Sequence, residues 1–183
     1  SGSHKAVQFL LDRNAAVEAV DKTGKAPLHY VCTRSHPPPD KASTKKKRRE
    51  AWRSAIASQQ YLEVAQTLVN FGASVNKADA AGRSPLHCAA ENGATEAAGY
   101  LLSLGAAVNG RDNQNMTALH RASIAGDCDM AKLLIFTGAN VEAAAKWHWG
   151  DGVRALHLAA EHGRADLVRC LCQYGAQVNV VDE

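Results

Sequence analysis

Apolar side chains along this chain recur in pairs of short helical patterns. Between residues 84 and 105 the sequence reads SPLHCAAENGATEAAGYLLSLG. Two stripes within it have the spacing of a helix face, and their members are Leu86, Ala89 and Ala90, then Ala97, Leu101 and Leu102. A glycine follows each stripe, and glycine commonly ends a helix. Asn14 and Asn115 stand at glycine positions elsewhere, which suits a left-handed backbone. The pattern predicts a helix, a turn, a second helix and an extended finger.

The start of the first helix carries a capping signal. Ser84 precedes Pro85; serine caps helix N-termini, and proline is tolerated at the first helical position, where its missing N–H is not needed. Ala26 and Arg154 take the capping position in two other copies of the pattern. Since losing a cap costs about 1 kcal/mol, we expect these two helices to be less stable.

The whole unit repeats along the chain. Residues 79–111 align with residues 112–144 at a shift of 33, so that His87 matches His120. His157 follows His120 by 37 residues, which places four extra residues between Val141 and Gly152. His29 precedes His87 by 58 residues, which implies a 25-residue insertion at about 36–60. One such unit cannot bury its own apolar face, so the units must stack in a row.

This repeat resembles the ankyrin repeat, whose opening motif appears here as APLHYV, SPLHCA, TALHRA and RALHLA. The resemblance implies an all-α solenoid of helix-turn-helix units with short β-hairpin fingers. We expect a single domain over residues 1–183. Its parts are a partial repeat (1–20), a repeat with the basic insertion (21–78), a third unit (79–111), a repeat with an extended finger (112–148), and a last repeat with the start of another (149–183).

Both ends of the chain lack the polar face that closes most repeat arrays. The sequence opens in a second helix, and Asp182 is in register to begin another repeat. We therefore expect a fragment of a longer array, which is a monomer or associates weakly with itself through its uncapped ends.

The recurrent histidines raise the question of catalysis. His29, His87, His120 and His157 occupy one position of the repeat, so a repeated structural hydrogen bond explains them better than an active site. No nucleotide-binding loop, zinc-protease motif or nucleophile elbow is found in the sequence. We predict no enzyme activity, no catalytic residues, no cofactor and no metal site.

The number and spacing of the cysteines indicate a cellular compartment. The five cysteines are odd in number and lack paired C-x2-C spacing, which indicates reduced thiols in the cytoplasm or nucleus. No apolar run approaches the ~18 residues of a membrane span, so we expect no membrane contact.

The two tryptophans of KWHWGDG lie in the short insertion and Trp52 lies in the long one. The resemblance implies a groove of finger tips and first helices that binds protein or peptide partners. The indoles either contact a partner, as tryptophan often does in interfaces, or pack against the neighbouring finger. The predicted partner-binding residues are Trp147, His148, Trp149, Lys25, Arg83, Glu91, Asn92, Met116, Arg121, Ile124, Leu158, Glu161 and His162.

The long insertion is basic and carries a predicted helix. Seven basic and two acidic residues lie between Pro37 and Gln60, a net charge of +5 against +3 for the whole chain. Its basic patch comprises Lys45, Lys46, Lys47, Arg48, Arg49 and Arg53. Three interpretations fit this composition: a nuclear-import signal, a contact for an acidic partner or phosphate backbone, or a mobile loop that is merely exposed to solvent. Apolar spacing after Ser43 or Thr44 predicts that the following helix is extended at its N-terminus.

These features favour a protein-interaction scaffold without catalysis. A regulatory or targeting segment of a larger enzyme or transporter is the first alternative. Binding of nucleic acid through the basic patch is less favoured, because Trp52 alone offers a base-stacking side chain there.

Overall fold

The computed structural model describes residues 2–33, 62–148 and 150–178. Its helices form two rows. The first helices of the units are α2 (Pro27–Cys32), α4 (Pro85–Asn92), α6 (Ala118–Ala125) and α8 (Ala155–Glu161). The second helices are α1 (Gly2–Leu11), residues 62–70, α5 (Thr95–Ser103), α7 (Cys128–Phe136) and α9 (Ala165–Gln173).

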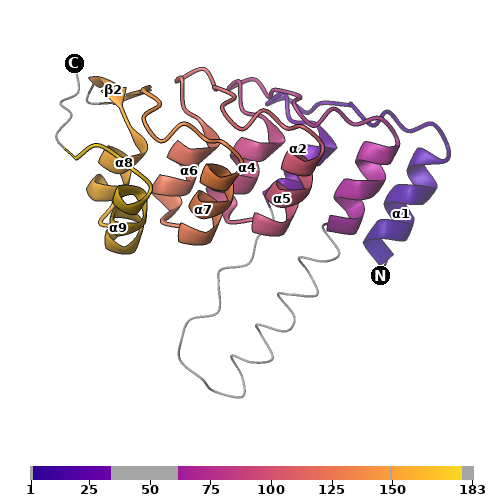
Figure 1. Ribbon diagram of the computed structural model, residues 1–183. Helices are drawn as coiled ribbons and strands as arrows, with labels where there is room; N and C mark the ends of the chain where they lie inside the picture. The colour runs from indigo at the N-terminus through magenta and orange to yellow at the C-terminus, as the bar shows by residue number, and fades with distance from the viewer. Residues whose placement is uncertain (1, 34–61, 149, 179–183) are drawn as a thin grey trace, which may run out of the picture.

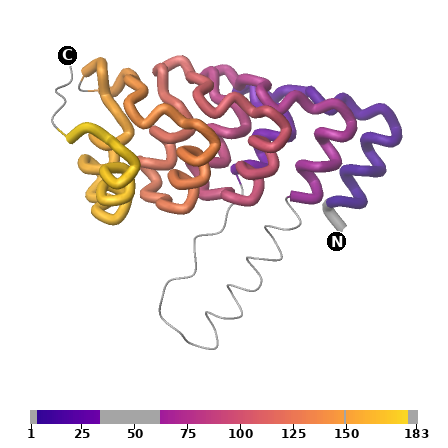
Figure 2. Tube along the Cα trace, viewed as in Figure 1, coloured from indigo at the N-terminus to yellow at the C-terminus, as the bar shows by residue number. Residues whose placement is uncertain are grey.

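Each row stacks on itself and on the other row. In the first row α2 contacts α4, α4 contacts α6, and α6 contacts α8; in the second row α5 contacts α7, which contacts α9. The pairs α4–α5, α6–α7 and α8–α9 join the rows within one unit. Figures 1 and 2 show the result, an elongated array with α1 at one end and α9 at the other. The stacked units predicted from the repeat are confirmed.

The predicted helix signals lie where the helices begin and end. Ser84 is the N-cap of α4, and Gly93 ends that helix with a left-handed φ of 69°. Asn14 and Asn115 adopt φ values of 63° and 58°, as expected for asparagine at a glycine position. Asp127, which the sequence analysis did not single out, caps α7 by accepting from the backbone N–H groups of residues 129 and 130.

Small residues in both rows allow close stacking. Side chains with no exposed surface include Ala65, Ala89, Ala90, Ala98, Ala122, Ala131 and Ala159. They form one continuous core together with the leucines of the second helices. Alanine loses little side-chain entropy on burial and lets two backbones approach, so the core can run the length of the array without a bulky centre.

The extended finger of the fourth unit is a β-hairpin. Strands β1 (Ala145–Trp147) and β2 (Gly150–Val153) pair antiparallel. In the part of the chain that the structure describes, this is the single two-stranded sheet, and the earlier fingers are built of turns. The mostly helical solenoid is confirmed. The long insertion, with its predicted helix start at Ser43 or Thr44, lies outside the described residues.

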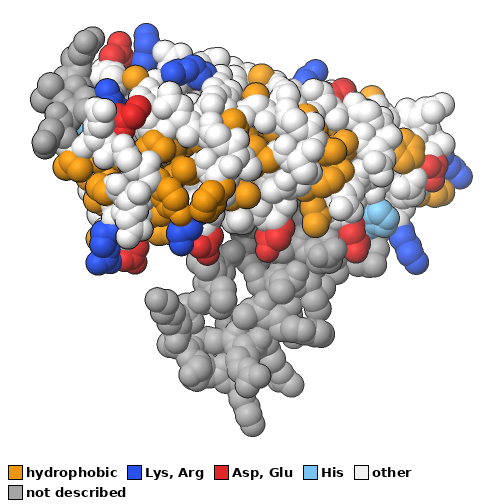
Figure 3. Space-filling view, viewed as in Figure 1, with side chains coloured by type: hydrophobic (Ala, Val, Ile, Leu, Met, Phe, Trp, Pro, Cys, Tyr) orange, Lys and Arg blue, Asp and Glu red, His pale blue; other side chains and the backbone are white. Residues whose placement is uncertain are grey.

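The face that carries the second helices is partly apolar. Figure 3 shows hydrophobic side chains gathered in a band over α5, α7 and α9. Phe136, the most exposed of the large hydrophobic residues described, contacts Tyr174 edge-to-face at 5.5 Å between ring centroids. Among the described helices, none combines the length and apolar character that crossing a membrane requires.

Candidate functional site

Three aspartates hold the finger turns in one shape. Asp21 accepts from the backbone N–H groups of Thr23 and Lys25, at 2.8 and 2.9 Å. Asp79 and Asp112 repeat both bonds with the residues two and four positions later, at 2.9 Å each. Because a carboxylate replaces water as the acceptor for these N–H groups, the turns are fixed before any partner arrives.

Backbone hydrogen bonds join neighbouring fingers. The N–H of Ala80 donates to the carbonyl of Thr23, at 2.9 Å. The same relation links Asn113 to Ala81 at 3.0 Å and Lys146 to Gln114 at 2.8 Å. The tips therefore form one connected edge along the array.

The recurrent histidines connect each first helix to the next unit. His87 Nδ1 accepts from the backbone N–H of Ser84 at 3.2 Å, so the proton of the neutral ring is on Nε2. Nε2 then donates to the carbonyl of Met116, at 3.0 Å. His29 and His120 make equivalent contacts with the carbonyls of Arg83 and Val153, at 3.0 and 3.2 Å.

Burial keeps two of these rings neutral. It lowers the pKa of His87, and it lowers the pKa of His120 to about 4 even though the hydrogen bonds to backbone carbonyls favour the charged ring. The predicted structural hydrogen bond is confirmed for His29, His87 and His120. Their two ring nitrogens are occupied by backbone groups, which leaves these rings no nitrogen for proton transfer to a substrate.

A second set of repeated hydrogen bonds, from backbone N–H groups to side chains of the preceding unit, was not predicted from the sequence. Asn76, Asn109 and Glu142 are spaced by 33 residues, and each accepts a backbone N–H of the next unit at 2.7–2.9 Å. Glu18 bonds to the N–H of Ser74 in the same way, at 2.6 Å. The 33-residue spacing of polar residues was visible in the sequence, but surface polar residues are common, so spacing alone did not reveal their partners.

Charged pairs lie where fingers meet first helices. Arg83 contacts Asp79 at 2.9 Å and Glu91 at 3.4 Å. Burial alone would raise the pKa of Asp79, but hydrogen bonds from the backbone and guanidinium of Arg83 outweigh it and lower the pKa. Arg121 pairs with Asp112, whose side chain is buried. In the pairs with Asp79 and Asp112 the arginine is the more exposed partner, so the surface displays guanidinium groups in fixed positions.

Trp147 lies on β1, half-buried over a small cluster of its own. This cluster contains Met116, Ala145, Val153 and Leu158, with Trp147 packed against it. The indole also lies 4.9 Å from the ring of His148 and 6.4 Å from that of His162, centroid to centroid. Its Nε1 is buried and has no hydrogen-bond partner among the described residues.

Comparison with known families agrees with this geometry. A family model of ankyrin repeats, in three copies, matches residues 54–145, and a single ankyrin repeat matches residues 151–183. The chain belongs to the ankyrin-repeat family. A search of the curated proteins found no match to this chain.

Ankyrin repeats are generally protein–protein interaction modules and are typically non-catalytic. In this array, the residues of the groove that the resemblance implies lie on the finger turns and the first helices. Within the described residues, no group of three or more His, Cys, Asp or Glu side chains has the arrangement of a metal site.

The structure separates the predicted contact residues into two groups. Glu91, Asn92, His148 and Glu161 are exposed, and Lys25, Arg83, Arg121, Ile124, Trp147 and His162 are partly exposed. Met116 and Leu158 are fully buried. For these two the expected partner contact is corrected: they support Trp147 from within the ankyrin array, because the longer finger covers them.

Several sequence predictions lie outside the described residues. These are Trp149, Trp52 and the basic patch of Lys45, Lys46, Lys47, Arg48, Arg49 and Arg53. Their proposed roles stay predictions.

Proposed function

We propose that this chain is a protein-interaction scaffold whose ankyrin groove binds a peptide segment or surface of a partner protein, without bond chemistry. The observation that carries the proposal is the fixed geometry of the finger turns and first helices that would line this groove. Its turns are held by Asp21, Asp79 and Asp112, and its units are joined by His29, His87 and His120. A surface fixed before binding loses little conformational entropy on association, which favours affinity.

The exposed groove side chains support a partner of mixed chemistry. Arg83 and Arg121 present guanidinium groups, while Glu91 and Glu161 present carboxylates. Ile124 and Trp147 add partly exposed apolar surface. Polar groups of both signs beside apolar anchors are typical of protein interfaces rather than of small-metabolite pockets.

The absence of catalysis is supported by how the histidines are used. Each of His29, His87 and His120 has backbone partners at both ring nitrogens. Burial also raises the pKa of the thiol of Cys88, beside His87, to about 11, so that this thiol stays protonated at neutral pH. Adjacent histidine and cysteine therefore do not form a nucleophile pair.

The experiment is a pull-down with the 183-residue chain, followed by mass spectrometry and an affinity measurement for the partner identified. Glu91→Arg reverses a charge in the groove, beside Arg83. Glu96→Arg makes the same exchange at an exposed position on α5, in the other row, and is the matched control. We expect Glu91→Arg to weaken binding at least tenfold and Glu96→Arg to change it by less than twofold.

Equal effects of the two variants would contradict a groove-bound partner. An interface on the second helices would also contradict it. In that case neither variant would change the affinity, whereas alanine substitutions in the second helices would abolish binding.

A further inference from the structure

One position of the first helices carries a carboxylate in two units. Glu91 on α4 and Glu161 on α8 each follow the recurrent histidine of their unit by four residues, and both are exposed. For Glu91 the chain itself supplies the counter-charge. The guanidinium of Arg83, four residues before the same histidine, lies 3.4 Å from its carboxylate. The same arrangement in the last unit would need an arginine four residues before His157.

The last unit has no arginine at that position. Val153 takes the place and is fully buried beneath the long finger. Arg154, the next residue, pairs with a carboxylate of the preceding unit. Among the described residues, the ion-pair partners of Glu161 are His148 and His162, at 3.5 and 3.9 Å. Histidine is not a permanent cation as arginine is, so no permanent positive charge in the described part of the chain contacts this carboxylate.

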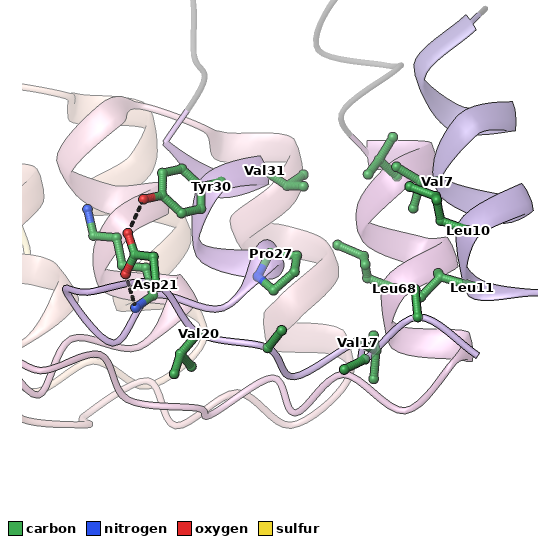
Figure 4. A pocket seen from close by; sticks show the side chains of 15 residues that line it. Val7, Leu10, Leu11, Val17, Val20, Asp21, Pro27, Tyr30, Val31 and Leu68 are labelled. Carbon is green, nitrogen blue, oxygen red and sulfur yellow. Dashed lines mark hydrogen bonds between the residues drawn. The ribbon is translucent and has the colours of Figure 1, made fainter. Parts of the chain in front are cut away.

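Four other carboxylates on the finger side of the array are bound by groups of the chain itself. Asp21 accepts from the hydroxyl of Tyr30, as Figure 4 shows, and from that of Thr23. The next three each pair with an arginine: Asp79 with Arg83, Asp112 with Arg121, and Glu142 with Arg154. Glu161 differs from these four because its neighbours are imidazole rings.

Aromatic rings line the surface next to Glu161. Trp147 on β1 packs against Leu158, one helical turn before Glu161 on α8. The indole centroid lies 4.9 Å from that of His148 and 6.4 Å from that of His162, the two imidazoles that flank the carboxylate. The three ring side chains and Glu161 all keep contact with solvent. The long finger therefore brings rings and a carboxylate into one accessible cluster.

The chemistry of this cluster selects among the groups that a partner could present. An anion would be repelled by the carboxylate, and an apolar side chain would remove water from a charge that has no permanent counter-charge. An ammonium group matches the charge but is compact and strongly hydrated. A guanidinium group donates two parallel N–H bonds to a carboxylate and also stacks on aromatic faces. Of these groups, the guanidinium fits both the carboxylate and the rings.

We propose that Trp147, His148, Glu161 and His162, the long-finger site, bind an arginine side chain of the partner that lies in the groove. The partner's guanidinium takes the role towards Glu161 that Arg83 has in the unit of α4. This inference rests on the proposed function for the existence of such a partner. It adds the chemistry that the partner must carry at the last unit of the array.

The probe is N-acetyl-arginine methylamide, titrated into the full 183-residue chain at low ionic strength and neutral pH. NMR follows the ring signals of Trp147 and His162, and we expect both to shift and saturate at millimolar probe, because a single ion pair at an exposed site is weak. The citrulline derivative keeps the shape without the charge and should bind at least tenfold more weakly. The lysine derivative keeps the charge without the planar fork and should bind at least threefold more weakly.

The decisive variant is Glu161→Gln, which removes the charge with almost no change in shape. It should lower the affinity for the arginine probe at least tenfold. The matched control is Glu91→Gln, the same exchange at the equivalent position of α4, where Arg83 already pairs with the carboxylate. We expect this control to change the affinity by less than twofold. Both carboxylates are exposed, so both variants should keep the wild-type melting temperature, which checks that they are folded.

Three results would overturn the long-finger site. Equal binding of the arginine and lysine derivatives, or of the arginine and citrulline derivatives, would show that the guanidinium is not recognised. Equal losses in Glu161→Gln and Glu91→Gln would show attraction to the whole surface and not to one site. Signals of Trp147 and His162 that do not respond to the probe would show that no arginine binds there. The proposed function is tested separately, since it depends on Glu91→Arg and the partner protein itself.

Discussion

The Nε2 atom of His120 lies 3.2 Å from the carbonyl oxygen of Val153, 33 residues further along the chain. Through this bond the start of α6 holds the second strand of the next finger. His87 does the same for the carbonyl of Met116, at 3.0 Å. Since both rings are buried, breaking one contact leaves a carbonyl without its donor in the interior, which costs about 1–3 kcal/mol.

The first prediction concerns pH. Burial lowers the pKa of His120 to about 4, below the value of about 6.5 for a histidine in an unfolded chain. Between these values the unfolded chain binds more protons than the folded one, so stability decreases as the pH falls. From pH 7 to pH 5 we expect His120 alone to remove on the order of 1–2 kcal/mol of unfolding free energy.

Urea unfolding of the wild type and of His120→Gln at both pH values measures this contribution. Glutamine has no ionisable group, so the variant should lose less stability than the wild type over this interval, although it starts from a lower value. A variant with the full wild-type pH dependence would show that His120 is not the titrating group.

The second prediction concerns helix capping. Ser84 caps α4, and its hydroxyl lies 2.9 Å from His87 Nδ1, while Ala26 takes this place before α2 without a side-chain partner. Ala26→Ser should raise the unfolding free energy by roughly 0.5–1 kcal/mol, and Ser84→Ala should lower it by about 1 kcal/mol. Differential scanning calorimetry of the two variants checks both directions. A decrease for Ala26→Ser would mean that the buried site has no room for the hydroxyl.

The third prediction separates packing from partner contact at the long finger. Trp147 covers Met116 and Leu158, so Trp147→Ala should reduce stability by about 1–3 kcal/mol and the melting temperature by several degrees. Lys146→Ala, on the same strand with an exposed side chain, is the control and should leave the melting temperature within about one degree. An unchanged melting temperature in Trp147→Ala together with lost partner binding would instead assign the indole to the interface.

The fourth prediction tests the left-handed backbone at Asn115, whose φ is 58°. Alanine is strained in this conformation by about 1 kcal/mol or more, whereas glycine adopts it freely. Asn115→Ala should therefore lower the urea midpoint clearly, and Asn115→Gly should lie within about 0.5 kcal/mol of the wild type. Equal stability of the two variants would show that asparagine is needed for its side chain and not for its backbone.

The repeat itself could be predicted because its signals are local. Ser84 and Pro85 begin a helix, Gly93 ends it, and the 33-residue spacing from His87 to His120 sets the unit. The structural role of the histidines followed from their recurrence. Contact residues were harder to predict: Met116 and Leu158 occupy variable positions that looked like surface, yet the hairpin of the fourth unit folds over them. The cytoplasmic or nuclear location and the role of the basic patch stay predictions.

By itself the sequence determined which units form and that they must stack, because caps, glycines and apolar spacing act within a few residues and one unit cannot bury its own face. The tertiary structure alone decided which side chains stay exposed. Leu10 and Leu101 hold the same place in the same pattern, but α4 covers Leu101 and no described helix covers Leu10. Burial depends on which other element of the chain packs against a residue. The local sequence pattern is the same at both leucines, so it does not specify that element.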